Sequence, residues 1–355
     1  MRILPVLLAA GLACVCTASA QSTSGTATTN PVGYITVNCP AGSDTILSVP
    51  FHQSPAFVAP LSAAPSISGS TATLDFSATG VSWTANQFAG SYYVRFTAGT
   101  KIGSYYTVTA NTSNTLTIAL NGDTLSAVAS GDGVKLIAYW TLDTLFPPAT
   151  QTTVVASAGT LGFQRKTELL FPDLLSQGIN LAPNRKFYLN GTTWTSATGT
   201  PAAGSTIILP DSYFILRHPS TVSATTFSPA GTVEISQVVS PLFTQTSGQQ
   251  DNFVALTRPV PVALKDSGLA SSFVASAGNL GFQRRDELLV FDNTIIGINK
   301  APSAKYYMVG TSWINASGAT NADNDLVFQP GTGVIVRKYQ NASSTTAFWQ
   351  NTPTY

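Results

Sequence analysis

Few side chains in this sequence could move a proton at neutral pH. The chain contains two histidines, His52 and His218. His218 stands opposite Lys338 when the two copies of an internal repeat are aligned, so the repeat does not require an imidazole at that position. Both histidines are therefore interpreted as packed or exposed side chains without a catalytic role.

Paired carboxylates are the second means of acid–base chemistry, because two of them can hydrolyse a glycosidic bond. The acidic pair that recurs in the repeat is Glu168 and Glu287, and each follows an arginine by three positions, at Arg165 and Arg284. In a turn, such an arginine closes on its glutamate. These residues predict a structural ion pair used twice, with hydrolysis as an open alternative.

One polar loop alternates oxygen ligands as calcium-binding loops do, at Asn321, Asp323 and Asp325. However, Leu326 stands where an EF-hand needs glycine, and Thr332 stands where it needs a bidentate glutamate. A polar loop is the favoured interpretation, and a looser calcium site is the alternative. No other metal, no cofactor and no catalytic residue is assigned.

Aromatic side chains could stack on sugar rings. Three Tyr-Tyr pairs lie in strand-like runs, where neighbouring rings point to opposite faces, so one ring of each pair is a candidate glycan contact. The candidates are Tyr92, Tyr93, Tyr105, Tyr106, Tyr306 and Tyr307. Trp194 and Trp313 hold equivalent places in the repeat, which predicts a core anchor used twice.

Many of these candidate residues lie in an internal repeat, which predicts the strands and turns that position them. ASAGTLGFQRKTELLF at 156–171 recurs as ASAGNLGFQRRDELLV at 275–290, with twelve of sixteen residues identical. The match continues over roughly 154–218 and 273–338. KFYLNGTTW contains Asn190-Gly191 between two strand-like runs, which is a strong hairpin signal. The doubled phrase holds no nucleophile, histidine or metal set, so it is interpreted as framework.

Other β-branched and aromatic runs are separated by tight turns, and helical periodicity is scarce. TATLDFS, SYYVRFTA, SYYTVTAN, TLTIAL and GVKLIAYW lie between the first copy and its upstream strand. The sequence thus predicts an all-β chain of two related β-sandwich-like modules, with a small SH3-like or OB-like β-barrel inserted in the first. The expected parts are a signal peptide at 1–20, a first module at 21–63 and 149–220, the barrel at 64–148, a second module at 221–345 and a C-terminal tail at 346–355.

Composition bears on location and partners. Charged residues make up 9% of the chain and the net charge is +1, so the chain has no excess of positive charge with which to bind nucleic acid.

The N-terminal sequence predicts export. A charged start, an apolar stretch and Ala18-Ser19-Ala20 predict signal-peptide cleavage before Gln21. No later run is apolar enough for a transmembrane helix. Cys39 is then the one cysteine left, and a small buried residue is expected there.

Several motifs in this order carry a resemblance: PVGYITV, DTILSVPF, YYVRFTAGTKIGSYYTVTANTSNTLTIAL, YWTLDTLFP, NFVALTRPVPVAL, DELLVFDNTIIGINK, YYMVGTSW and FQPGTGVIVRK. The chain resembles a paralogous family of secreted β-rich proteins of verrucomicrobial bacteria. The resemblance implies export and β architecture along the chain, and it supplies no reaction and no catalytic residue. The end of each copy is also similar to modules of large bacterial surface proteins. The first copy departs there, with Pro-Asp-Ser-Tyr at 210–213 replacing Pro-Gly-Thr-Gly at 330–333.

The sequence favours a secreted, non-enzymatic protein of the cell surface or extracellular matrix, with the periplasm as a further location. Self-association through strand edges is the expected mode of interaction. An extracellular glycan-binding module is the main alternative. An outer-membrane barrel, disfavoured by the 21 prolines, and a hydrolase are further alternatives.

Overall fold

The computed structural model describes residues 31–343 and 345–353. This part of the chain is built of antiparallel β-strands, one four-residue α-helix, α1 (Leu142–Leu145), and short 3-10 turns. The expected all-β class is therefore confirmed. Within the same residues, no helix is long and apolar enough to cross a membrane. The predicted signal peptide lies outside the described residues.

The first sheet contains the first copy of the repeat. Its strand order is β15-β14-β13-β17-β3. The bounds are β15 (Thr193–Ser196), β14 (Arg185–Asn190), β13 (Glu168–Phe171), β17 (Phe214–His218) and β3 (Ser43–Leu47). One face of this sheet buries Leu169, Trp194 and Phe214 in a common apolar core, which holds the sheet together by removing large apolar surfaces from water.

The second sheet contains the second copy. Its strand order is β21-β26-β22-β23-β24-β25. The bounds are β21 (Gln250–Val254), β26 (Val334–Lys338), β22 (Glu287–Val290), β23 (Ala304–Val309), β24 (Ser312–Asn315) and β25 (Thr320–Asn321). Apart from β25, it has the strand order of the first sheet, so β3 corresponds to β21 and β17 corresponds to β26. Both β3 and β21 are edge strands.

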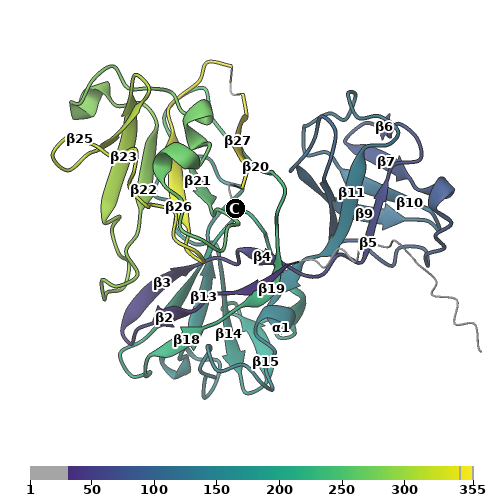
Figure 1. Cartoon of the computed structure of the whole chain (residues 1–355). Helices are drawn as coiled ribbons and strands as arrows, with labels where there is room; N and C mark the ends of the chain where they lie inside the picture. Colours follow the sequence, from purple (N-terminus) through teal and green to yellow (C-terminus); the bar gives the residue numbers. More distant parts are fainter. Residues whose placement is uncertain (1–30, 344, 354–355) are drawn as a thin grey trace, which may run out of the picture. The chain divides into compact units, whose positions relative to one another are not determined.

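The third sheet lies between β4 and β12 in the chain and has seven strands, in the order β5-β11-β8-β9-β10-β7-β6. The bounds are β5 (Phe57–Pro60), β11 (Gly133–Ala138), β8 (Tyr92–Phe96), β9 (Tyr105–Asn111), β10 (Thr115–Ala119), β7 (Thr71–Asp75) and β6 (Ser66–Ser68). The five expected strands are all present. The closed barrel was wrong, because β5 and β6 end an open sheet that curls into a half-barrel (Figure 1).

Four small sheets connect these bodies. Their strands pair as β1-β19-β4, β18-β2, β12-β16 and β20-β27. The bounds are β1 (Val32–Tyr34), β2 (Val37–Cys39), β4 (Phe51–His52), β12 (Trp140–Thr141), β16 (Ile207–Ile208), β18 (Thr225–Phe227), β19 (Ala230–Val233), β20 (Val238–Leu242) and β27 (Ala347–Asn351). The segment expected as a C-terminal tail thus contributes β27, whose Trp349 is 2% exposed.

The repeated hairpin is present, but its turn lies one residue later than expected. Asn190 pairs with Thr193 as the last residue of β14, so the loop is Gly191-Thr192. Gly191 has φ of +58°, while Asn190 has no positive φ. Glycine at the first loop position is typical of a type II′ turn, which matches the twist of the strands.

Candidate functional site: the junction of the two repeat-bearing sheets

A buried ion pair stands at the edge of each repeat-bearing sheet. In the first sheet, Arg217 on β17 is the register partner of Asp44 on β3, and its Nε and NH2 donate to the two carboxylate oxygens at 2.7 and 2.8 Å. In the second sheet, Arg337 on β26 donates to Asp251 on β21 at 2.7 and 3.0 Å. Two parallel bonds fix the guanidinium in orientation as well as distance.

Each ion pair is held by a loop that belongs to the other sheet. Asn299 donates its backbone N–H to Asp44 Oδ2 at 2.7 Å and accepts from Arg217 NH2 through its Oδ1 at 2.6 Å. The Asp44 N–H donates to the carbonyl of Gly297 at 2.9 Å. The sheets are therefore joined by three hydrogen bonds at one aspartate–arginine pair.

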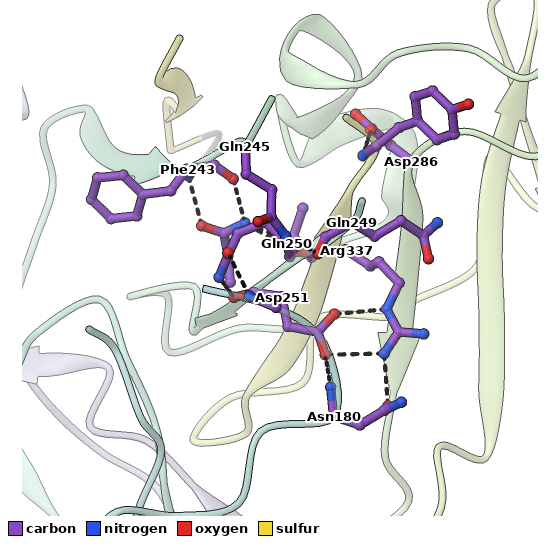
Figure 2. Close-up of polar contacts among 12 residues, drawn as sticks. Asn180, Phe243, Gln245, Gln249, Gln250, Asp251, Asp286 and Arg337 are labelled. Carbon is purple, nitrogen blue, oxygen red and sulfur yellow. Dashed lines mark hydrogen bonds and ion pairs between the residues drawn. The ribbon is translucent and has the colours of Figure 1, made fainter. Parts of the chain in front are cut away.

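The same three bonds recur with the roles of the two sheets exchanged. Asn180 donates its N–H to Asp251 Oδ2 at 2.8 Å and accepts from Arg337 NH2 at 2.9 Å, as Figure 2 shows. The Asp251 N–H donates to the carbonyl of Gly178 at 2.9 Å. These two sets (Asp44, Arg217, Gly297 and Asn299; Asp251, Arg337, Gly178 and Asn180) are called the reciprocal junction below. Contacts exchanged in this way are characteristic of a two-fold interface.

The sequence Gly-Ile-Asn explains how both loops reach their targets. Asn180 and Asn299 have φ of 57° and 55°, in the left-handed region that asparagine tolerates better than most residues. In this conformation the asparagine presents its N–H and its side-chain oxygen to the same ion pair. The repeat thus keeps Gly-Ile-Asn in both copies for a contact that neither copy makes within itself.

The outward N–H groups of both edge strands continue the reciprocal pattern. Just beyond β3, Ser48 donates its N–H to the carbonyl of Gly331 at 2.9 Å. Just beyond β21, the equivalent Ala255 donates to the carbonyl of Asp211, also at 2.9 Å. The edge strands β3 and β21 are therefore capped inside the chain along these residues.

Tyr213 and Gly333, which are equivalent in the repeat, face each other at the centre of this junction. A Cβ at Gly333 would lie 2.2 Å from Cδ1 of Tyr213. Tyr213 packs in an apolar cluster drawn from both sheets, with Ile46, Phe253 and Ile335. Two bulky residues cannot occupy both positions, because they would overlap. This is why the first copy ends in Pro-Asp-Ser-Tyr and the second in Pro-Gly-Thr-Gly.

The chemistry of the junction is that of binding rather than proton transfer. Arginine keeps its proton throughout the accessible pH range, and both oxygens of each aspartate accept hydrogen bonds from the arginine of the same set. The hydrogen bonds to Asp44 raise the pKa of Arg217 further. Sequence reasoning missed the junction because each set joins residues far apart in the chain. The one sequence feature that could have pointed to the junction is the recurrence of Gly-Ile-Asn in both copies.

A second cluster of charges lies where β4, the seven-stranded sheet and the segment after β19 meet. Glu234 is 1% exposed, with Lys135 Nζ at 3.4 Å, Arg95 NH1 at 3.6 Å and His52 Nε2 at 3.7 Å. Burial raises the pKa of Glu234, but the charges of Arg95 and Lys135 and the hydrogen bonds from Ser236 together outweigh burial, so the net shift of this pKa is downward. Burial lowers the pKa of His52. This cluster was also missed, since Glu234 stands alone in a short apolar run.

The arginine–glutamate pairs expected from the doubled phrase have equivalent surroundings. Arg165 lies 3.3 Å from Glu168, and Arg284 lies 3.6 Å from Glu287. The two guanidinium groups also lie over equivalent rings, Tyr188 at 4.7 Å and Tyr307 at 4.6 Å. Each arginine is thereby held by a carboxylate and an aromatic face at once. Trp194 and Trp313 are each 1% exposed within their apolar cores.

The oxygen-rich loop is already engaged in hydrogen bonds within the chain. Asp323 accepts from the Trp313 N–H at 2.7 Å and from the Asn321 side chain at 2.8 Å. These bonds lower the pKa of Asp323. The backbone carbonyl of Asp325 accepts from the Leu264 N–H. The described residues contain no group of three histidine, cysteine, aspartate or glutamate side chains placed to hold a metal ion.

The six tyrosines considered as glycan contacts lie inside the protein. Tyr93, Tyr106, Tyr306 and Tyr307 are buried, and Tyr92 and Tyr105 are half-buried. The Tyr105 hydroxyl donates to Asp211 at 2.7 Å. Burial raises the pKa of Tyr93 to about 12. The four buried rings offer no open face on which a sugar could stack.

The remaining single candidates are also interior residues. Cys39 is buried, and burial raises the pKa of its thiol to about 11. His218 is fully buried between the hydroxyl groups of Thr167 and Thr225, at 2.9 and 2.8 Å. Burial lowers the pKa of His218.

Comparisons with known proteins return no similarity to this chain: no family model, no curated protein and no solved structure matches it.

Proposed function

We propose that the chain is a secreted, non-enzymatic structural and interaction protein of the cell surface or extracellular matrix. The observation that carries this proposal is the reciprocal junction. Residues that recur in the two copies, including Arg217 and Arg337, are engaged in joining one sheet to the other. Charged residues of the repeat thus hold the two sheets together. This use of charge is expected of a structural protein that must stay folded as one rigid unit.

The finer architecture is part of the same proposal. The first and second sheets are treated as two related modules with sandwich-like packing, and the seven-stranded sheet as an insertion in the first. Their identical strand order from β3 to β15 and from β21 to β24 supports this relation. Membership of a family of secreted verrucomicrobial proteins is likewise a proposal, supported by the ordered motifs of the sequence.

Fractionation of the native source tests this function. Outer membrane, cell surface and culture medium are probed for the chain starting at Gln21. The proposal expects it in a sedimentable surface layer or matrix, released by a chaotrope. Recovery as a soluble monomer in the medium would contradict the structural role. Turnover of a polysaccharide panel by the purified chain would contradict the non-enzymatic assignment.

A further inference from the structure

The doubled phrase builds the same 3-10 turn twice, and the two turns have the same internal bonds. Gln164 donates its N–H to the Leu161 carbonyl at 2.9 Å, and its side-chain oxygen accepts from the Leu161 N–H at 3.2 Å. Gln283 and Leu280 form the same two bonds at the same distances. Each turn is therefore a fixed structure, closed by the glutamine at its end.

Each turn holds a phenylalanine and a leucine out in solvent. Phe163 and Phe282 are both 85% exposed, while Leu161 is 56% and Leu280 is 58% exposed. The fold gains almost nothing from side chains that remain in water, because apolar groups stabilise a protein by leaving it. The framework therefore explains the glutamine and the arginine of the phrase, but it does not explain these apolar residues.

A cation follows each exposed phenylalanine by three positions, at Lys166 in the first copy and Arg285 in the second. Lys166 is exposed and Arg285 is half-exposed. Each set (Leu161, Phe163 and Lys166; Leu280, Phe282 and Arg285) is called an apolar tip below. A tip thus combines a projecting ring with a cation three positions further along the chain, and in the second tip the Arg285 guanidinium lies over the ring of Tyr339 at 4.4 Å.

The two tips lie away from the reciprocal junction. The bridge between Ser157 and Asn190 places the first tip beside the end of β14, and the bridge between Ser276 and Val309 places the second beside the end of β23. In each sheet, two strands separate that position from the junction edge, β13 and β17 in the first and β22 and β26 in the second. Closing the junction therefore leaves both tips free to bind elsewhere.

A hollow on the second module is a candidate binding site for the ring and the cation of a tip. It has a volume of about 110 Å³ and is lined by the apolar residues Val260, Pro261, Val262, Leu326 and Pro353 and by polar and charged residues that include Asp266, Arg258, Asn351 and Thr352. Val260 and Leu326 are 41% and 58% exposed, and Asp266 is also exposed. An enclosed apolar cavity of roughly 150 Å³ holds a whole benzene molecule, so a hollow of about 110 Å³ that opens to solvent takes the edge of an aromatic ring.

We propose that an apolar tip of one molecule docks in this hollow of a second copy of the chain. The ring of Phe163 or Phe282 enters the apolar lining, and the adjacent cation of the tip meets Asp266. Because the tip and the hollow are different surfaces, the contact is heterologous and extends into chains of molecules unless it closes into a ring. This inference rests on the proposed structural function and names its partner.

The test compares self-association of the chain starting at Gln21 with that of a Phe163→Ser/Phe282→Ser variant by sedimentation velocity over a range of concentrations. Loss of an aromatic anchor is expected to weaken association by at least about 30-fold. Leu175→Ser is the matched control, because Leu175 is 91% exposed and lies outside both tips. Thermal unfolding should be unchanged in all three proteins, since the altered side chains are already in water.

A charge exchange tests the hollow independently. Asp266→Lys should weaken association, and adding Lys166→Asp and Arg285→Asp should restore it. Undiminished association of the double phenylalanine variant would overturn the docking inference and leave the structural function intact. A wild-type chain that remains monomeric at every concentration would overturn the inference and the assembly role together. Tip-dependent binding to anionic phospholipid vesicles without self-association would also overturn it.

Discussion

At the scale of single residues, the junction depends on an asymmetric pair at equivalent positions. Tyr213 fills the space that a side chain at Gly333 would need, with 2.2 Å between the ring and the missing Cβ. Gly333 does not have a positive φ, so its requirement for glycine is one of space and not of backbone conformation. A substitution at Gly333 therefore measures the cost of close packing without a contribution from backbone strain.

Gly333→Ala should therefore lower the free energy of unfolding by about 1–3 kcal/mol through overpacking. Chemical denaturation followed by tryptophan fluorescence measures this. Gly162→Ala is the control, because nothing lies within 4 Å of its Cβ position and its φ is not positive. The cost of Gly333→Ala should be smaller when it is measured in a Tyr213→Ala background, because the added methyl then has space. Equal stability of Gly333→Ala and Gly162→Ala would show that the contact with Tyr213 is not tight.

A second pair of equivalent positions has exchanged one kind of polar contact for another. In the first sheet, buried His218 bonds to the hydroxyl of Thr167, which also accepts from the Val155 N–H. In the second, Lys338 bonds to the carboxylate of Asp286, which accepts from the Val274 N–H. One site thus holds a neutral pair where the other holds an ion pair.

His218→Lys alone should cost about 3–5 kcal/mol, because it buries an ammonium group without a carboxylate. Adding Thr167→Asp recreates the contact of the second sheet and should restore most of the lost stability. Thermal unfolding of the single and double variants at pH 7 measures both effects. If the double variant is no more stable than the single one, the two interior sites are not interchangeable as described.

At the scale of elements, the sequence predicted the strands far better than their arrangement. TLTIAL and GVKLIAYW became β10 and β11, because β-branched runs between turn residues have a strong local preference. Closure of the seven-stranded sheet was not predictable, since it depends on whether β5 and β6 meet. The doubled phrase forms strands β13 and β22 and the 3-10 turns before them, a placement that the sequence did not predict.

The junction was beyond sequence reasoning for a physical reason. Asp44 and Arg217 are 173 positions apart, and Asp44 and Asn299 are 255 positions apart. No local pattern of hydrophobicity or turn chemistry records such pairings. Self-association was expected through strand edges in general, and the edge strands β3 and β21 are capped by loops of the opposite sheet. The proposed contact with a second copy uses the apolar tips and the hollow instead.

In the whole molecule, the two repeat-bearing sheets hold each other through equivalent contacts made in both directions, so neither ion pair is complete without the other sheet. Breaking one buried ion pair by removing its charge costs about 3–5 kcal/mol. The loss of stability should affect both sheets, because the loop of the opposite sheet loses its hydrogen-bond partners.

Hydrogen exchange of an Asp251→Asn variant, followed by mass spectrometry, tests this claim most directly. Asp75→Asn is the control, because Asp75 lies at the end of β7 in the seven-stranded sheet. We expect faster exchange both in β21 and in the Gly178–Asn180 loop of the first sheet, while the control exchanges like the wild type. Faster exchange confined to β21, with the loop unchanged, would contradict the reciprocal junction.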